Sequence, residues 1–114
     1  MKYIVFESCL LLLLRICAVC AGICDVSLSY FGTCITATTS CRHNPGHRRK
    51  WSSQPFVGRK PKGNIDLSAA ILFTGLHPTP TLRMLRSMKV QVFEDRTFYS
   101  YQRAYLLPVV HAVG

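Results

Sequence analysis

The stretch "ICAVCAGIC", residues 16–24, decides the fold, because it places Cys17 and Cys20 two residues apart. A turn with this spacing can direct two thiolates at one metal ion. The second half of a zinc ribbon is expected 15 to 20 residues further on. Cys41 lies near that distance and begins "CRHNPGH", residues 41–47. The two segments together predict a metal-binding unit.

The expected fourth cysteine is missing, because position 44 is Asn44. Neutral imidazole is also a zinc ligand, and His43 and His47 are the available substitutes. We therefore predict one zinc ion held by four side chains, with His43 as the alternative fourth ligand: Cys17, Cys20, Cys41 and His47. Between the two halves, residues 25–39 alternate apolar and polar residues and turn at Gly32, which predicts a β-hairpin.

A secretory signal peptide is the competing interpretation of the N-terminal region. Lys2, the apolar run "CLLLLL" (residues 9–14) and a small-residue site after Ala21 fit it. Glu7 and Arg15 oppose it, and cleavage would leave an odd number of cysteines. A membrane span needs about 20 apolar residues, more than this run supplies. We predict that residues 4–16 form a strand or helix of a core, with a secreted cysteine-rich protein as the alternative.

Positive charge is concentrated in the middle of the chain. The sequence has 14 Lys+Arg and 5 Asp+Glu, a formal net charge of +9. Between Asp25 and Asp66 there is no acidic residue, but the stretch contains seven cations: Arg42, Arg48, Arg49, Lys50, Arg59, Lys60 and Lys62. Such a block is typical of a polyanion-binding segment or of a solvated loop. We predict that its last six members approach DNA phosphates from a flexible loop and supply affinity.

The second half of the sequence is predicted to be helical. Residues 52–63 contain prolines, glycines and cations and indicate a linker. Beyond it, Asn64, Thr79 and Asp95 are candidate caps of three short helices in residues 64–114. This pattern is typical of a helix-turn-helix unit. In its third helix, three aromatic residues recur at helical spacing and are predicted to face inward: Phe98, Tyr101 and Tyr105. The outward face then carries three residues that we predict to contact DNA and to supply specificity: Arg96, Tyr99 and Arg103.

Several motifs carry a resemblance to a known family. They are "KYIVFESCLLLLLRIC" (2–17), "WSSQP" (51–55), "GNIDLSAAILFTG" (63–75) and "RTFYSYQ" (96–102). Residues 2–110 resemble the region upstream of the catalytic core in transposon-derived animal proteins of the Kolobok and Mutator-like transposase type. The resemblance implies a zinc-binding module that precedes an RNase H-like domain, and it implies that this chain is a fragment. The family pattern has a cysteine pair where this sequence has Cys41 followed by Asn44.

The combined prediction is an α+β protein with a zinc-ribbon-like unit (1–51), a basic linker (52–63) and a helical unit (64–114). An RNase H-like core needs three converging carboxylates on two metal ions, and the five acidic residues of this sequence do not suggest such a trio. We therefore predict a non-catalytic, nuclear, DNA-associated protein without a small-molecule substrate and without membrane attachment. The sequence leaves the target DNA and the oligomeric state open.

Overall fold

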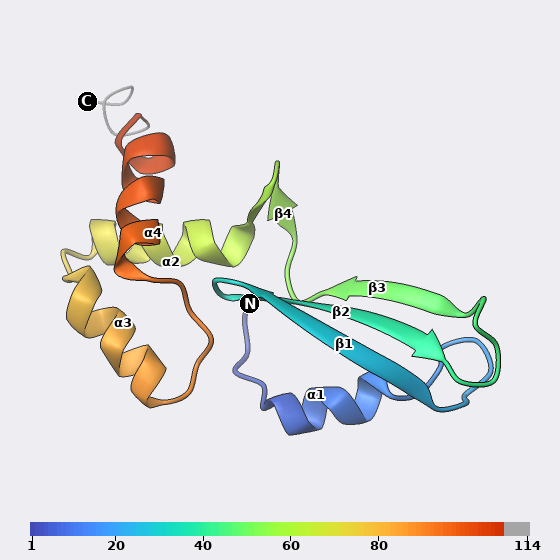
Figure 1. The fold of residues 1–114 in the computed structure, drawn as a ribbon. Coiled ribbons are helices and arrows are strands. Elements are labelled where there is room, and N and C mark those ends of the chain that lie inside the picture. The colour runs from blue at the N-terminus through green and yellow to red at the C-terminus, as the bar shows by residue number, and fades with distance from the viewer. Residues whose placement is uncertain (109–114) are drawn as a thin grey trace. The chain divides into compact units, whose positions relative to one another are not determined.

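The computed structural model describes residues 1–108, and these form two compact units. Unit 1 contains residues 1–29 and 36–52, and unit 2 contains residues 30–35 and those from 53 onward. The predicted α+β class is confirmed, because a small antiparallel sheet is followed by helices (Figure 1). The final six residues of the predicted helical unit lie outside the described part of the chain.

A three-stranded sheet forms the body of unit 1. Its strands are β1 (Cys24–Phe31), β2 (Cys34–Cys41) and β3 (Arg48–Ser52), in the spatial order β1-β2-β3. β1 and β2 are the predicted hairpin, and Gly32 at their turn has a φ of 61°, a left-handed conformation that glycine adopts without strain. β2 and β3 run antiparallel, with Ala37 opposite Trp51. The β-branched run of β2 suits the centre of such a sheet.

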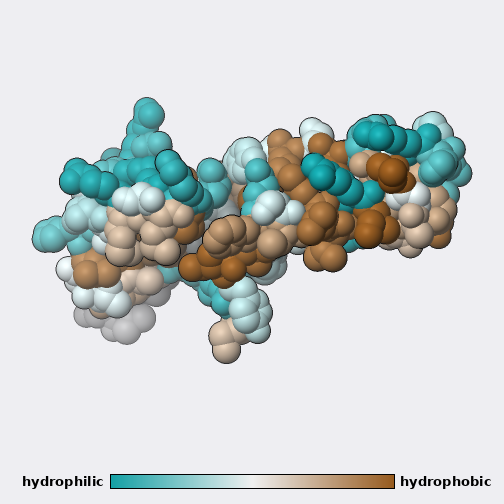
Figure 2. Space-filling view, turned by 90° about the horizontal axis from the view of Figure 1, so that it is seen from below, coloured by the Kyte–Doolittle hydropathy of each residue, from teal (hydrophilic) through white to brown (hydrophobic). Residues whose placement is uncertain are grey.

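The apolar N-terminal segment folds as a helix, α1 (Glu7–Leu14). It lies along one face of the sheet (Figure 1), where Leu14 is buried. The outer surface of this part of unit 1 remains apolar, as the brown residues in Figure 2 show. Its exposed members include Leu12, Leu13, Ile16, Val19 and Ile23. Among the helices of residues 1–108, none combines the length and the hydropathy that crossing a bilayer requires.

β3 was not predicted, because its sequence, RRKWS, was interpreted as the start of a flexible basic loop. Arg48, Arg49 and Lys50 are instead paired with Ser40, Thr39 and Thr38 of β2. Charged residues have low strand propensity, but strand formation depends strongly on the neighbouring strand. Here the register with β2 overrides the local preference.

Unit 2 is mainly helical. The predicted linker region forms a short hairpin of β4 (Phe56–Val57) and β5 (Lys60–Pro61). The helices α2 (Lys62–Phe73), α3 (Pro78–Ser87) and α4 (Asp95–Tyr101) follow, and α4 continues into a π-helical segment, η1 (Gln102–Leu106). Four buried side chains from these helices and from the segment between α3 and α4 form the core: Ile71, Leu82, Phe93 and Phe98.

The three predicted cap residues do not begin the helices. The positions before α2, α3 and α4 are Pro61, His77 and Glu94. Pro78 takes the first position of α3, where a missing N–H has no consequence. Asn64 lies within α2, and its side chain is fully buried. The Asn64 side chain therefore makes hydrogen bonds to another segment of the chain instead of capping the start of a helix.

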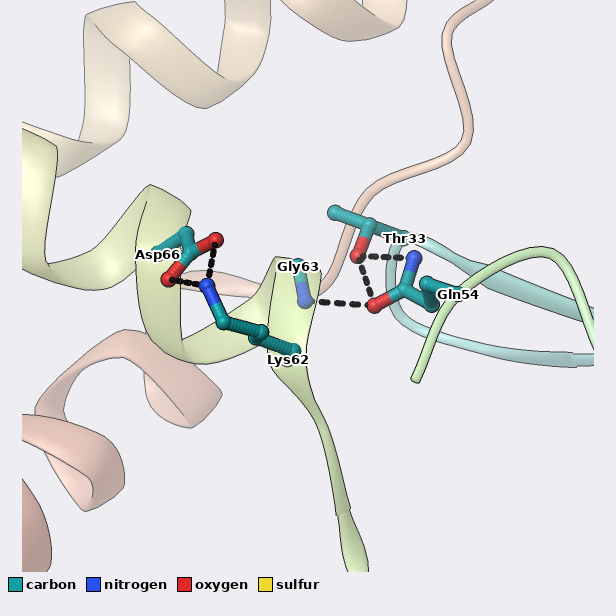
Figure 3. Close-up of polar contacts among 5 residues, drawn as sticks. All are labelled: Thr33, Gln54, Lys62, Gly63 and Asp66. Atoms are coloured by element: carbon teal, nitrogen blue, oxygen red, sulfur yellow. Dashed lines mark hydrogen bonds and ion pairs between the residues drawn. The ribbon is translucent and has the colours of Figure 1, made fainter. Parts of the chain in front are cut away.

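Asn64 joins α2 to the turn between β1 and β2, and these residues all belong to unit 2. Its Nδ2 donates to the Phe31 carbonyl at 3.1 Å. Its Oδ1 accepts from the Thr33 backbone N–H at 2.7 Å and from the Thr33 hydroxyl at 2.6 Å. Gln54 extends this network, because its amide contacts Thr33 Oγ1 and the Gly63 N–H (Figure 3). The network satisfies buried polar groups on both segments.

Substitution of Asn64 by alanine is expected to destabilise unit 2. The change leaves the Phe31 carbonyl and the Thr33 N–H without their partner, and each unsatisfied buried group costs about 1–3 kcal/mol. We expect a loss of about 2–4 kcal/mol in the free energy of unfolding, measured by denaturation followed by circular dichroism. Asp66→Asn is the control on the same helix. It removes a partly exposed ion pair with Lys62 (Figure 3), which contributes about 0–1 kcal/mol. Equal losses in the two variants would contradict this assignment.

Candidate metal centre

The structure brings together the four side chains that were predicted to hold zinc: Cys17, Cys20, Cys41 and His47. Their ligand atoms all lie within 4.8 Å of one another. The Cys20 and Cys41 sulfurs are 3.6 Å apart, and the Cys17 sulfur is 3.7 Å from Nδ1 of His47. A tetrahedron with zinc–sulfur bonds of about 2.3 Å has edges of about 3.8 Å. The spacing of the four side chains therefore fits a single metal ion.

The first two ligands lie on a tight turn between α1 and β1. The Cys17 N–H donates to the Gly22 carbonyl at 2.7 Å, and the Ala21 N–H donates to the Cys17 carbonyl at 2.9 Å. Ala21 has a φ of 59°, a conformation that non-glycine residues rarely adopt. An isolated bridge between Ile16 and Ile23 closes the base of the turn. This backbone arrangement turns both sulfurs toward the same point.

The other two ligands flank the connection between β2 and β3. Cys41 ends β2, and its N–H donates to the His47 carbonyl at 3.1 Å. Between them, the His47 N–H donates to the Asn44 carbonyl at 2.9 Å, and the Gly46 N–H donates to Oδ1 of Asn44 at 2.9 Å. This asparagine-initiated turn returns the chain to Cys41. It presents an imidazole beside a thiol at the end of the sheet.

The electrostatic environment prepares the Cys17 sulfur for metal binding. Backbone N–H groups of Cys20 and Val19 donate to this sulfur and lower its pKa from 9.0 to about 6. At neutral pH the group is therefore mainly a thiolate, the form that binds metals. The Gly22 N–H lowers the pKa of Cys20, but the sulfurs of Cys41 and Cys17 outweigh it, so that this pKa is raised. Sulfurs held this close repel one another as thiolates, and a divalent cation would relieve that repulsion.

His43, the alternative fourth ligand, is not part of the cluster. The His43 ring lies over the turn, close to the backbone of Gly22. A Cβ atom on Gly22 would come within 2.5 Å of Cδ2 of His43. The histidine thus packs on the backbone of the turn. A side chain at position 22 would displace this ring, so glycine allows the histidine to pack there.

The remaining cysteines are also free thiols. Cys24 is buried in contact with the cluster, and burial raises its pKa, which favours the neutral thiol. Cys34 is buried in unit 2, and Cys9 is exposed. Within residues 1–108, the cluster around Cys17 is the one group of three or more side chains with suitable metal-ligand spacing.

Asn44 contacts the ring nitrogen of His47 that faces away from the cluster. The distance between Asn44 Nδ2 and His47 Nε2 is 3.2 Å. If Nδ1 binds a metal, Nε2 carries the ring proton and needs an acceptor, as metal-bound histidines usually have. The Asn44 amide presents a nitrogen to Nε2, because its oxygen is used by the Gly46 N–H. Asparagine therefore supports this turn but gives His47 a poor outer partner.

Replacement of Asn44 by aspartate is expected to tighten metal binding. One carboxylate oxygen can accept from Gly46 and the other can accept the proton on Nε2. Outer partners of this kind change metal affinity by about 10- to 100-fold, so we expect a gain of about tenfold, measured by competition with a chromophoric chelator. Asn44→Ala is the control, because it removes both contacts and should weaken binding. Weaker binding of the aspartate variant would show that His47 does not use Nδ1.

The cations predicted to contact DNA are distributed over different elements. Arg48, Arg49 and Lys50 are exposed on β3 in unit 1. In unit 2, Lys60 lies over the rings of Phe31 and Tyr101, with Nζ 5.6 and 5.8 Å from their centroids. Such cation–π contacts bind the ammonium group within the unit.

The other predicted DNA contacts also lie in unit 2. Lys62 forms an ion pair with Asp66 at 3.0 Å, and Arg59 is exposed between β4 and β5. Arg96 and Tyr99 are exposed on α4, and Arg103 is exposed on η1. Phe98 and Tyr101 of α4 are buried, as the helical spacing indicated, but Tyr105 is exposed on η1, so the prediction that it faces inward was wrong.

Comparison with known proteins gives no relative: no protein-family model, no curated protein and no solved structure matches this chain. Geometry therefore carries the functional argument.

Sequence reasoning did not find the contribution of Asn44, or that of Gly22 beneath His43. The only available signals were the Asn-Pro-Gly turn composition and a glycine two residues after Cys20. Both indicate a turn, and neither indicates which ring lies above it.

Proposed function

We propose that this chain is a non-catalytic, DNA-associated module whose sheet unit is stabilised by one zinc ion. The observation that carries the proposal is the convergence of three cysteines and one histidine within 4.8 Å. Thiolate and imidazole ligands at tetrahedral spacing suit zinc better than the oxygen-preferring ions magnesium and calcium.

A structural ion is favoured over a catalytic one because the protein supplies four ligands. Catalytic zinc ions keep one position for water or substrate, whereas structural ions have four protein ligands. Within residues 1–108, no three carboxylates converge at metal-ligand spacing. Asp25 pairs with Arg42, Asp66 with Lys62, and Asp95 accepts from the Thr79 hydroxyl. These positions support the proposal that the chain has no carboxylate-based nuclease chemistry of its own.

DNA is the proposed partner because of the charge. The net charge is +9, and β3 carries exposed cations beside the cluster, among them Arg48 and Lys50. Positive surface of this kind attracts the phosphate backbone without regard to sequence. The resemblance to regions upstream of transposase cores supports the same partner and a nuclear location. In this proposal the zinc ion fixes the fold of the sheet unit, and the charge supplies affinity.

The zinc proposal predicts close to one zinc ion per purified chain, measured by elemental analysis. Cys17→Ser and His47→Ala are expected to lose the metal, because each removes one ligand of four. His43→Ala is the matched histidine control and is expected to retain it. A chelator should unfold the sheet unit, because metal-binding energy is folding energy in small metal-stabilised units. Loss of zinc in the His43 variant, with retention in the His47 variant, would contradict the assigned ligand set.

The DNA proposal predicts that the zinc-loaded full chain binds duplex DNA at low salt. Affinity should fall linearly on a logarithmic scale with salt concentration, with a slope of about −0.9 for each phosphate neutralised. Fluorescence anisotropy with a labelled duplex at several salt concentrations measures both quantities. The net charge of +9 predicts that the chain binds the duplex. If the chain does not bind the duplex at low salt, the proposed function is wrong.

A further inference from the structure

We infer that the open face of the three-stranded sheet is the surface that contacts nucleic-acid phosphates, and that the α1-facing side of the sheet does not. This inference rests on the proposed association with DNA and assigns it to one surface of unit 1. It follows from the register of β3 and the position of α1.

The register separates the cations of β3 onto two faces. Neighbouring side chains on a strand point to opposite faces, and paired residues on adjacent strands share a face. Arg49 is opposite Thr39, and Trp51 is opposite Ala37. A hollow beside Leu10 and Leu13 of α1 is lined by three of these four residues: Thr39, Arg49 and Trp51. Arg49 therefore belongs to the side that α1 covers.

The alternate residues of β3 lie on the other face. Arg48 is opposite Ser40, Lys50 is opposite Thr38, and Ser52 is opposite Thr36. In β1, Val26 and Leu28 are less exposed than their neighbours and lie at a hollow with Leu11 of α1, so Ser27 and Ser29 are on the open face by alternation. The open face of unit 1 thus combines two cations with six hydroxyl-bearing residues: Ser27, Ser29, Thr36, Thr38, Ser40 and Ser52.

This composition suits phosphate oxygens. Hydroxyl groups of serine and threonine, together with arginine and lysine, are common donors to the nucleic-acid backbone. The acidic residue of β1, Asp25, is paired with Arg42 at 2.8 Å, which offsets its charge. The surface is therefore positive and rich in donors.

The same composition disfavours an anionic membrane as the occupant. Peripheral attachment requires apolar side chains that enter the lipid beside the cations. The open face presents hydroxyls, while the exposed apolar residues of unit 1 belong to the segment before α1, to α1 itself and to the turn that follows it, including Phe6, Leu13 and Val19. Nucleic acid is the polyanion that this face fits.

The test compares two variants that remove the same charge from unit 1. R48Q/K50Q neutralises the open face, and R15Q/R49Q neutralises two exposed arginines that line the hollows under α1. At 0.1 M salt, we expect the first variant to bind a labelled duplex about 10- to 60-fold more weakly, with a salt slope reduced by about 2. The second variant should retain most of the affinity. Thermal melting with zinc bound checks that both variants are folded.

A second pair of variants tests the hydroxyls. Thr38→Val removes a hydroxyl at the centre of the open face and keeps the shape of the side chain. We expect about two- to tenfold weaker binding with an unchanged salt slope, because no charge is lost. Thr39→Val is the matched control on the covered face and should leave binding unchanged.

Three outcomes distinguish the surface from the function. If both double variants weaken duplex binding equally, the open face is not the contact surface, because total charge alone then explains the affinity. The proposed DNA association would still hold. Binding of the unaltered chain to vesicles of anionic lipid, without binding to the duplex, would overturn both. Selective weakening by R48Q/K50Q and Thr38→Val supports the surface.

Discussion

The sheet unit depends on the convergence of four ligand atoms on one point. Apart from Leu14, Ala37 and Thr39, its buried residues are the three cysteines Cys17, Cys24 and Cys41. This is a small apolar core, and units of this size usually need a metal or a cross-link to remain folded. A metal ion bound by the four ligands would tie the turn before β1 to the end of β2 and the start of β3, and would compensate for the small apolar core.

The two units use different means of stabilisation. Unit 2 has a conventional apolar core of Ile71, Leu82, Phe93 and Phe98, to which the buried amide of Asn64 adds directional contacts. Unit 1 concentrates its organisation at one end of the sheet and leaves the outer surface of α1 apolar. The loss of metal should therefore affect the units unequally, because unit 2 has a core of its own.

The sequence was sufficient for the features that depend on residue type and local spacing. The grouping of three cysteines with a histidine follows from the Cys17–Cys20 spacing and from the histidines after Cys41, but the sequence left His43 as an alternative to His47. Helical periodicity indicates the buried Phe98 and Tyr101, but not the exposure of Tyr105. β3 could not be predicted, because its formation depends on pairing with a strand that is distant in space before folding. Asn64 was assigned to a helix end because a cap and a buried tertiary contact require the same side-chain chemistry.

His47 lies directly before β3, so a metal ion bound by it would act on the position of the whole strand. A shift of one residue would exchange the faces, turning Arg48 and Lys50 toward α1 and Trp51 toward solvent. Cys41 and His47 flank the connection between β2 and β3, and both belong to the cluster. The Cys41 N–H also donates to the His47 carbonyl, so β3 is held in one register with β2. A metal ion bound at this end of the sheet would reinforce that register, and with it the difference in chemistry between the two sides of the sheet.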